Sequence, residues 1–189
     1  MNATTTLNPA SHPRVLLLPG WLDSGPGHWQ TLWADRFGDQ RVEQADWQWP
    51  RRGDWMARLE EVILEDDRRV LLAAHSLGCH LVAAWAAHSR HTGRVSAALL
   101  VAPPDLEQAD TPVQLHHWRP TIRRPLPFPA LVAYSDNDPF SGASSSREIT
   151  AAWGAASHAC GPRGHLNAES GLGDWPAGRA MLIGLATGR

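Results

Sequence analysis

The chain has 189 residues, enough for one globular domain whose core needs neither disulfides nor a metal. Its 43% hydrophobic and 19% charged residues exclude global disorder, and its net charge of −2 gives no electrostatic basis for nucleic-acid binding. All 17 basic residues are arginine, which excludes a P-loop lysine, a Schiff-base lysine and a lysine general base.

The two cysteines and the amino-terminal residues indicate in which cellular compartment the protein is expected. Cys79 and Cys160 form no C-x-x-C pattern and are too few for a disulfide scaffold, which is typical of a reducing environment. Residues 1–13 are polar, without the basic and apolar regions of a signal peptide, and are predicted to be a disordered or extended tail of a single domain spanning 1–189. No segment approaches the roughly 18 apolar residues of a membrane span. We therefore expect a cytoplasmic protein with no membrane or nucleic-acid partner.

Short apolar runs alternate with helical periodicity along the chain, which predicts an α/β fold with a mostly parallel sheet and helices on both faces. Asp54 is expected to cap the second helix. The long segment 105–129, rich in proline and arginine, is the longest one without a predicted element. The predicted strands are Val15–Leu18, Arg41–Trp47, Val70–Ala74, Ala97–Val101, Leu131–Tyr134 and Ser157–Cys160. The predicted helices are Gly27–Phe37, Asp54–Glu65, Leu77–His88, Ser146–Trp153 and Trp175–Leu185.

The sharpest local feature is the run Ala74-His75-Ser76-Leu77-Gly78 between a predicted strand and a predicted helix. It matches the nucleophile elbow G-x-S-x-G, with alanine in place of the first glycine. Small residues flank the serine because the turn is tight and its backbone strained. The pattern predicts Ser76 as a nucleophile whose neighbouring amides, at a helix N-terminus, face an oxyanion; the alternative is a serine that only caps the helix.

A serine nucleophile needs a histidine to take its proton and an acid to orient that histidine. In the order Ser…Asp…His the acid and the base follow late strands, which predicts Asp138 and His165. Asp136 is the competing acid, although aspartate is also common in turns. His158 is the competing base, but it falls within the last predicted strand, where a core role is more usual.

Oxyanion donors and a substrate pocket are expected at the sheet edge where the candidate serine, acid and base lie. The backbone amides of Trp21, after the first strand, and Leu77 are the candidate donors, since Gly20 lets the backbone approach closely. Trp21, Trp118 and Phe140 fall in loops at this edge and are predicted to form an apolar acyl pocket, whereas Trp33, Trp55 and Trp85 have core spacing. The spacing of His158, Cys160 and His165 matches no usual zinc site, so no metal and no other cofactor is expected.

Six segments, spread along nearly the whole chain, resemble in sequence and order the small serine hydrolases of the YdeN or retinoblastoma-binding-protein type, from the α/β-hydrolase superfamily. The resemblance implies a compact α/β-hydrolase fold without a large lid domain and with Ser76, Asp138 and His165 as the triad. It also implies hydrolysis of esters or similar acyl compounds, with a small-molecule substrate. The segments are Pro19–Trp29, Ala74–Cys79, Leu100–Asp105, Leu126–Pro129, Ser135–Pro139 and Gly164–Gly171 followed by Trp175-Pro176.

Some members of that family bind a pocket protein through L-x-C-x-E. The nearest string, Leu77–Leu81, lacks the glutamate, so this partner is not expected. The favoured hypothesis is a serine hydrolase that acts through an acyl-enzyme. The alternatives are a catalytically silent binding protein with the same fold, and an acyltransferase using the same elbow.

Overall fold

A computed structural model describes residues 13–188, so the prediction of a tail over 1–13 lies almost wholly outside the described residues. Six strands form one sheet in the order β2-β1-β3-β4-β5-β6, and every neighbouring pair is parallel. The strands are β1 (Arg14–Leu18), β2 (Gln40–Arg41), β3 (Val70–His75), β4 (Val95–Val101), β5 (Ala130–Tyr134) and β6 (Ala156–Ala159).

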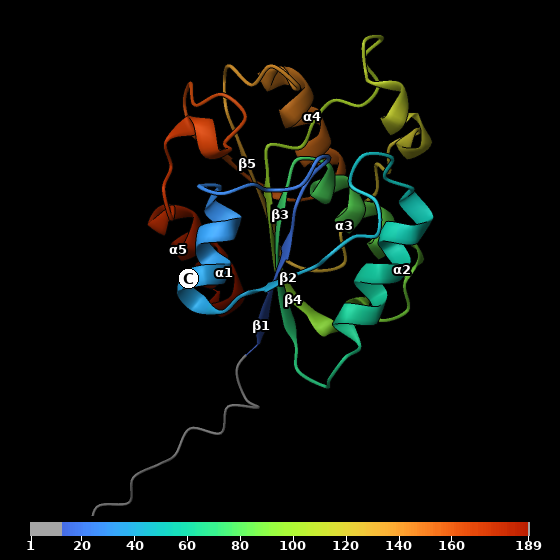
Figure 1. The fold of residues 1–189 in the computed structure, drawn as a ribbon, viewed down its shortest axis with the longest axis vertical. Helices are drawn as coiled ribbons and strands as arrows, with labels where there is room; N and C mark the ends of the chain where they lie inside the picture. Colours follow the sequence, from blue (N-terminus) through green and yellow to red (C-terminus); the bar gives the residue numbers. More distant parts are fainter. Residues whose placement is uncertain (1–12, 189) are drawn as a thin grey trace, which may run out of the picture.

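The helices lie on both faces of this sheet (Figure 1). The α-helices are α1 (Trp29–Phe37), α2 (Arg52–Ile63), α3 (Leu77–His88), α4 (Ala143–Ala152) and α5 (Pro176–Thr187). Short 3-10 helices are η2 (Thr92–Arg94), η3 (Val113–Trp118) and η4 (Ala168–Ser170). The all-parallel sheet covered by helices is the predicted α/β-hydrolase architecture, with no large lid domain among these elements.

Two apolar layers hold the helices to the sheet. Alternate residues of each central strand face opposite sides, so that in β1 Leu16 packs toward α2 and α3 and Leu17 toward α1 and α5. Because both faces are covered, β1, β3 and β4 are almost continuously apolar. The predicted core tryptophans Trp33, Trp55 and Trp85 are all buried.

The elements differ from the predictions at two places. The strand predicted over 41–47 is only the two-residue β2, because Asp46 accepts hydrogen bonds from the amides of Gln48 and Trp49 and turns the chain away. Helix α2 begins at Arg52 with Arg51 as N-cap, so Asp54 lies in its first turn and does not cap it. An acidic side chain there still interacts favourably with the helix dipole.

All strands run toward the same edge of the sheet, which Figure 1 shows at the top. The loops after β1, β3, β5 and β6 therefore meet there, and these are the loops that carry the candidate site residues. None of the helices between residues 13 and 188 combines the length and apolarity that a membrane crossing requires.

Candidate active site

Ser76 stands at the junction of β3 and α3 in a strained backbone conformation. Its φ of 53° and ψ of −124° lie in a region that L-residues rarely adopt. The conformation is held because the Ser76 amide donates a 2.8 Å hydrogen bond to the carbonyl of Val101, at the end of β4. The turn leaves Ser76 partly exposed, although its neighbours His75 and Leu77 are buried.

The glycines around the elbow allow close backbone approach. A Cβ at Gly78 would lie 2.3 Å from the carbonyl oxygen of Leu18, and a Cβ at Gly20 would lie 2.7 Å from the Cβ of Ser76. Real Cβ atoms do not approach this closely, so both positions require glycine for α3 to pack against the end of β1. The same contacts place the Gly20–Trp21 loop directly against Ser76.

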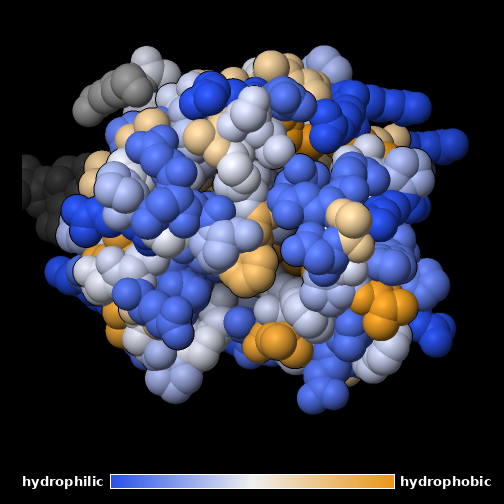
Figure 2. All heavy atoms as spheres, turned by 90° about the horizontal axis from the view of Figure 1, so that it is seen from above, coloured by the Kyte–Doolittle hydropathy of each residue, from blue (hydrophilic) through white to orange (hydrophobic). Residues whose placement is uncertain are grey.

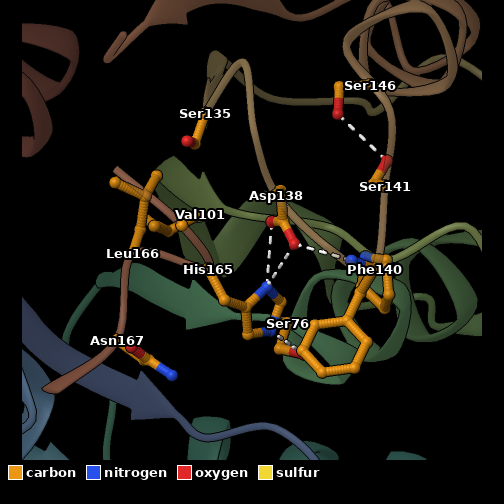
Figure 3. A network of polar contacts seen from close by, with 12 residues as sticks. Ser76, Val101, Ser135, Asp138, Phe140, Ser141, Ser146, His165, Leu166 and Asn167 are labelled. Carbon is orange, nitrogen blue, oxygen red and sulfur yellow. Dashed lines mark hydrogen bonds and ion pairs between the residues drawn. The ribbon is translucent and has the colours of Figure 1, made fainter. Parts of the chain in front are cut away.

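The structure brings Ser76, Asp138 and His165 into one hydrogen-bonded chain (Figure 3). The His165 Nε2 atom lies 2.9 Å from Ser76 Oγ, and its Nδ1 atom lies 2.9 and 3.0 Å from the two carboxylate oxygens of Asp138. An ionised carboxylate only accepts hydrogen bonds, so Nδ1 carries the proton that it donates to Asp138. In the neutral ring Nε2 then accepts from the Ser76 hydroxyl.

Burial distinguishes the two candidate acids and the two candidate bases. The Asp138 side chain is 2% exposed and accepts a further 2.9 Å hydrogen bond from the Phe140 amide. Asp136 is exposed, and its backbone amide donates a hydrogen bond to the carbonyl of Gly161. His158 lies in β6 as predicted, but the strand is an exposed edge of the sheet, so this histidine is not a core residue.

His75, which is not among the site residues predicted from the sequence, joins the elbow to the loop that carries His165. Its Nε2–H donates a 2.8 Å hydrogen bond to the main-chain carbonyl of His165, and the two rings pack edge to face with centroids 4.8 Å apart. Burial, together with repulsion from His28 and His165, holds the pKa of His75 well below its usual value. The His75 ring therefore stays neutral, and its Nε2–H continues to donate its hydrogen bond to the carbonyl of His165.

Three further hydrogen bonds fix the same loop. Buried Ser135 accepts from the Arg163 amide at 2.8 Å, and Asn137 Oδ1 accepts from the Gly164 amide at 2.8 Å. On the other side, the Trp29 indole donates to the carbonyl of Leu166 at 3.1 Å. Leu166, wholly buried with a φ of 49°, anchors the loop between sheet and helices.

An apolar cavity of about 210 Å³ borders Ser76. Trp21 and Phe140 line it as predicted, and the Phe140 ring packs edge to face on His165 with centroids 4.6 Å apart. Figure 2 views this edge from above and shows a few apolar groups, one of them near the centre, among mostly hydrophilic side chains. The full lining is Trp21, Leu22, Ser76, Leu77, Pro104, Pro112, Leu115, Phe140 and His165.

The prediction that Trp118 lines this pocket is wrong. Its side chain is 2% exposed, its indole donates to the carbonyl of Pro50 at 2.8 Å, and its ring packs edge to face on Trp55. The segment 105–129 contains η3, and Trp118 at its last position packs into the core beside α2. Leu115, from the same 3-10 helix, is the residue that reaches the cavity.

The amides of Trp21 and Leu77 donate to no other group among residues 13–188. Leu77 is the first residue of α3, where amides have no intrahelical acceptor. Both residues line the cavity together with Ser76. These two donors are therefore free for an oxygen that is bound there.

Competing chemistries find less support in the described residues. The thiol of Cys79 is buried beside the elbow, and burial raises its pKa far above the usual range, so it is not a thiolate nucleophile. No group of three His, Cys, Asp or Glu side chains within residues 13–188 is arranged to hold a metal ion, including His158, Cys160 and His165. The string Leu77–Leu81 lies buried in α3 and cannot be read by a partner.

A model of the serine hydrolase family matches residues 15–183. The chain belongs to this family. No curated protein matches it. The family membership and the parallel sheet agree with the resemblance to YdeN-like α/β-hydrolases stated from the sequence.

Solved structures show the same fold. A protein described as a YdeN-like hydrolase from Pectobacterium atrosepticum is 26% identical, with a TM-score of 0.82 over 93% of this chain and 91% of that one. The ydeN gene product of B. subtilis is 19% identical, with a TM-score of 0.73 over 94% and 100%. An esterase from a Rhodococcus species is 14% identical, with a TM-score of 0.67 over 93% and 92%.

Proposed function

We propose that the protein hydrolyses small esters through an acyl-enzyme formed on Ser76. The proposal is carried by the continuous hydrogen-bonded chain from Asp138 through His165 to Ser76, placed at the mouth of an apolar cavity. Membership of the serine hydrolase family, and esterases among the proteins that share the fold, support the same chemistry.

In the first half-reaction, His165 Nε2 takes the proton of the Ser76 hydroxyl as Oγ attacks the ester carbonyl carbon. The carbonyl oxygen becomes an oxyanion, which the amides of Trp21 and Leu77 receive. Asp138 holds the His165 ring in the required tautomer and stabilises the imidazolium. The imidazolium then gives its proton to the alcohol oxygen as the carbon–oxygen bond breaks, leaving the acyl group on Oγ.

In the second half-reaction, His165 takes a proton from water, and the resulting hydroxide attacks the acyl carbon. The tetrahedral species collapses, Ser76 recovers its proton from His165, and a carboxylic acid leaves. The apolar lining of Leu22, Leu115 and Phe140 favours an unbranched acyl chain, and its volume of about 210 Å³ favours a short one.

Hydrolysis of p-nitrophenyl acetate and butyrate tests this proposal. In Ser76→Ala, kcat should fall by about 10⁴-fold or more, to the residual rate that substrate binding and the oxyanion donors still supply. Ser144→Ala is the matched control, because Ser144 is exposed on α4 outside the cavity and should leave kcat unchanged. A kcat in purified Ser76→Ala close to that of the wild type would overturn the proposal.

A further inference from the structure

A second cavity, of about 260 Å³, also borders Ser76 and His165, and its walls are more polar than those of the apolar cavity. It lies between the 20–28 loop and the segment that follows His165. We refer to it as the polar cleft. Since both cavities contain the nucleophile and the base, the two parts of an ester can lie in different cavities. The lining is Gly20, Trp21, Asp23, Gly25, His28, His75, Ser76, His165, Asn167, Ala168 and Glu169.

His28, which lines this cleft, carries a buried hydrogen-bond donor without a partner in the described residues. As the N-cap of α1, its Nδ1 atom accepts a hydrogen bond from the Gln30 amide at 3.2 Å. Burial and repulsion from His165 lower the pKa of His28 to about 4, so the ring is neutral and its proton sits on Nε2. His28 is 4% exposed, and its Nε2 atom has no hydrogen-bond partner among residues 13–188. Such a donor is destabilising until an acceptor reaches it.

The remaining lining supplies acceptors and one further donor. Asp23 is ion-paired with Arg41, whereas Glu169 forms no ion pair with any side chain in the described part of the chain. His75 uses its Nε2–H on the carbonyl of His165, which leaves its Nδ1 lone pair as an acceptor. The Asn167 oxygen already caps η4, so its amide nitrogen is the group left for a ligand.

A hydroxyl group is the ligand chemistry that suits this combination, because it both donates and accepts. A quaternary ammonium would pair with Glu169 but leave the His28 donor unsatisfied. A carboxylate would satisfy His28 but meet repulsion from Glu169. An unsubstituted alkyl chain would satisfy none of these groups.

We infer that the polar cleft binds the alcohol portion of the ester, and that this alcohol carries further hydroxyl groups, as glycerol does. His28 donates to one hydroxyl oxygen, Glu169 accepts from a hydroxyl, and the acyl chain occupies the apolar cavity. The inference rests on the proposed esterase function and adds its substrate class.

Two butyrate esters test it. 1-Butyrylglycerol and propyl butyrate share the acyl group and a three-carbon alcohol and differ by two hydroxyl groups. A hydrogen bond of ordinary strength changes a rate constant by roughly 5-fold, so kcat/KM of the wild type should favour the glycerol ester by about 10-fold or more.

Two variants assign the preference to its residues. His28→Asn keeps an N-cap acceptor but removes the Nε2–H, and Glu169→Gln replaces the carboxylate at an exposed position where folding is not at risk. In each, the ratio of kcat/KM for the two esters should fall several-fold toward one. Glu148→Gln, on exposed α4 surface outside both cavities, is the matched control and should keep the wild-type ratio.

The outcomes separate this inference from the proposed function. A ratio near one in the wild type, or a ratio unchanged in Glu169→Gln, with Ser76-dependent hydrolysis of both esters, overturns the hydroxyl inference and leaves the esterase intact. Butyrylcholine hydrolysed faster than 1-butyrylglycerol, with that advantage lost in Glu169→Gln, would identify a cation site instead. Failure on every ester, p-nitrophenyl butyrate included, would overturn both.

Discussion

The elbow that carries Ser76 and the loop that carries His165 reach the same site by different means. The elbow is held by packing and backbone geometry, with Gly78 against Leu18 and the Ser76 amide on Val101. The loop around His165 is held by hydrogen bonds from four separate places, namely His75, Ser135, Asn137 and Trp29. Ser76 is therefore fixed by steric exclusion, whereas His165 is fixed by polar contacts that can be removed one at a time.

The largest effect on kcat is expected at Asp138, whose carboxylate hydrogen-bonds to His165. In Asp138→Asn, the side-chain amide cannot serve as the charged acceptor of the Nδ1 proton, so His165 loses its tautomer and its imidazolium is less stable. We expect kcat on p-nitrophenyl butyrate to fall by about 10⁴-fold, as the same change does in other Ser–His–Asp enzymes. Circular dichroism should be unchanged. Asp136→Asn, on the exposed neighbour, should retain activity, and a comparable loss there would contradict the assignment.

Steric exclusion at the elbow is tested by Gly78→Ala. The added Cβ lies 2.3 Å from the Leu18 carbonyl, so α3 must move away from β1 and carry Ser76 with it. A displacement of about 1 Å can cost 10²-fold in rate, and we expect at least that loss in kcat, with a lower Tm. Gly93→Ala is the control, because nothing lies within 4 Å of its added Cβ. Equal stability and activity of the two variants would show that the elbow is not packed as described.

Burial around the elbow also predicts a dependence of stability on pH. His80, buried in α3, donates to the carbonyl of Pro104 at 2.8 Å, and burial lowers its pKa to about 4. Because the folded-state pKa lies below the unfolded value of 6.5, the unfolded chain takes up the proton first as the pH falls. Stability present above pH 6.5 is therefore lost between pH 6.5 and 4.

At pH 5 this histidine should lower the free energy of unfolding by about 2 kcal/mol relative to neutral pH. Urea denaturation at pH 7 and pH 5 measures the difference. In His80→Leu the decrease between the two pH values should be smaller than in the wild type by that amount. An identical decrease in both proteins would mean that His80 titrates normally in the folded state.

The smallest effect concerns one of the polar contacts that hold the base. In His75→Leu the carbonyl of His165 loses its donor, and we expect kcat to fall about 10-fold with a smaller change in KM, because the ring of His165 is then less well oriented. His75→Gln can still donate and should recover part of the rate. Equal rates in the two variants would assign His75 a packing role rather than a positioning role.

The difference between the two regions also explains what the sequence predicts well. The elbow is local: strand, serine, glycine and helix follow one another within residues 70–88, and all are where the pattern placed them. Asp138 and His165 could be chosen because each follows a late strand, and parallel strands end at one edge. The all-parallel sheet with helices on both faces follows from the same alternation of apolar runs.

The contacts that hold the base could not be predicted, because they join residues far apart in the sequence. His75 and His165 are separated by 90 positions, and Trp29 and Leu166 by 137. Trp118 was misplaced for the same reason: whether a loop tryptophan faces a cavity or the core depends on where Pro50 and Trp55 lie. His28 gave no clear signal, because it lies within the helix predicted over 27–37, whereas the structure makes it the N-cap of α1.

Labelling with a fluorophosphonate probe tests the central claim most directly, because the probe reacts only with a serine whose proton is being removed. Intact mass and peptide mapping should show one adduct per folded chain, on Ser76, absent from Ser76→Ala and from protein unfolded in urea. Folded protein that takes up no probe, or an adduct on another serine, would contradict an account in which Asp138 and His165 activate Ser76.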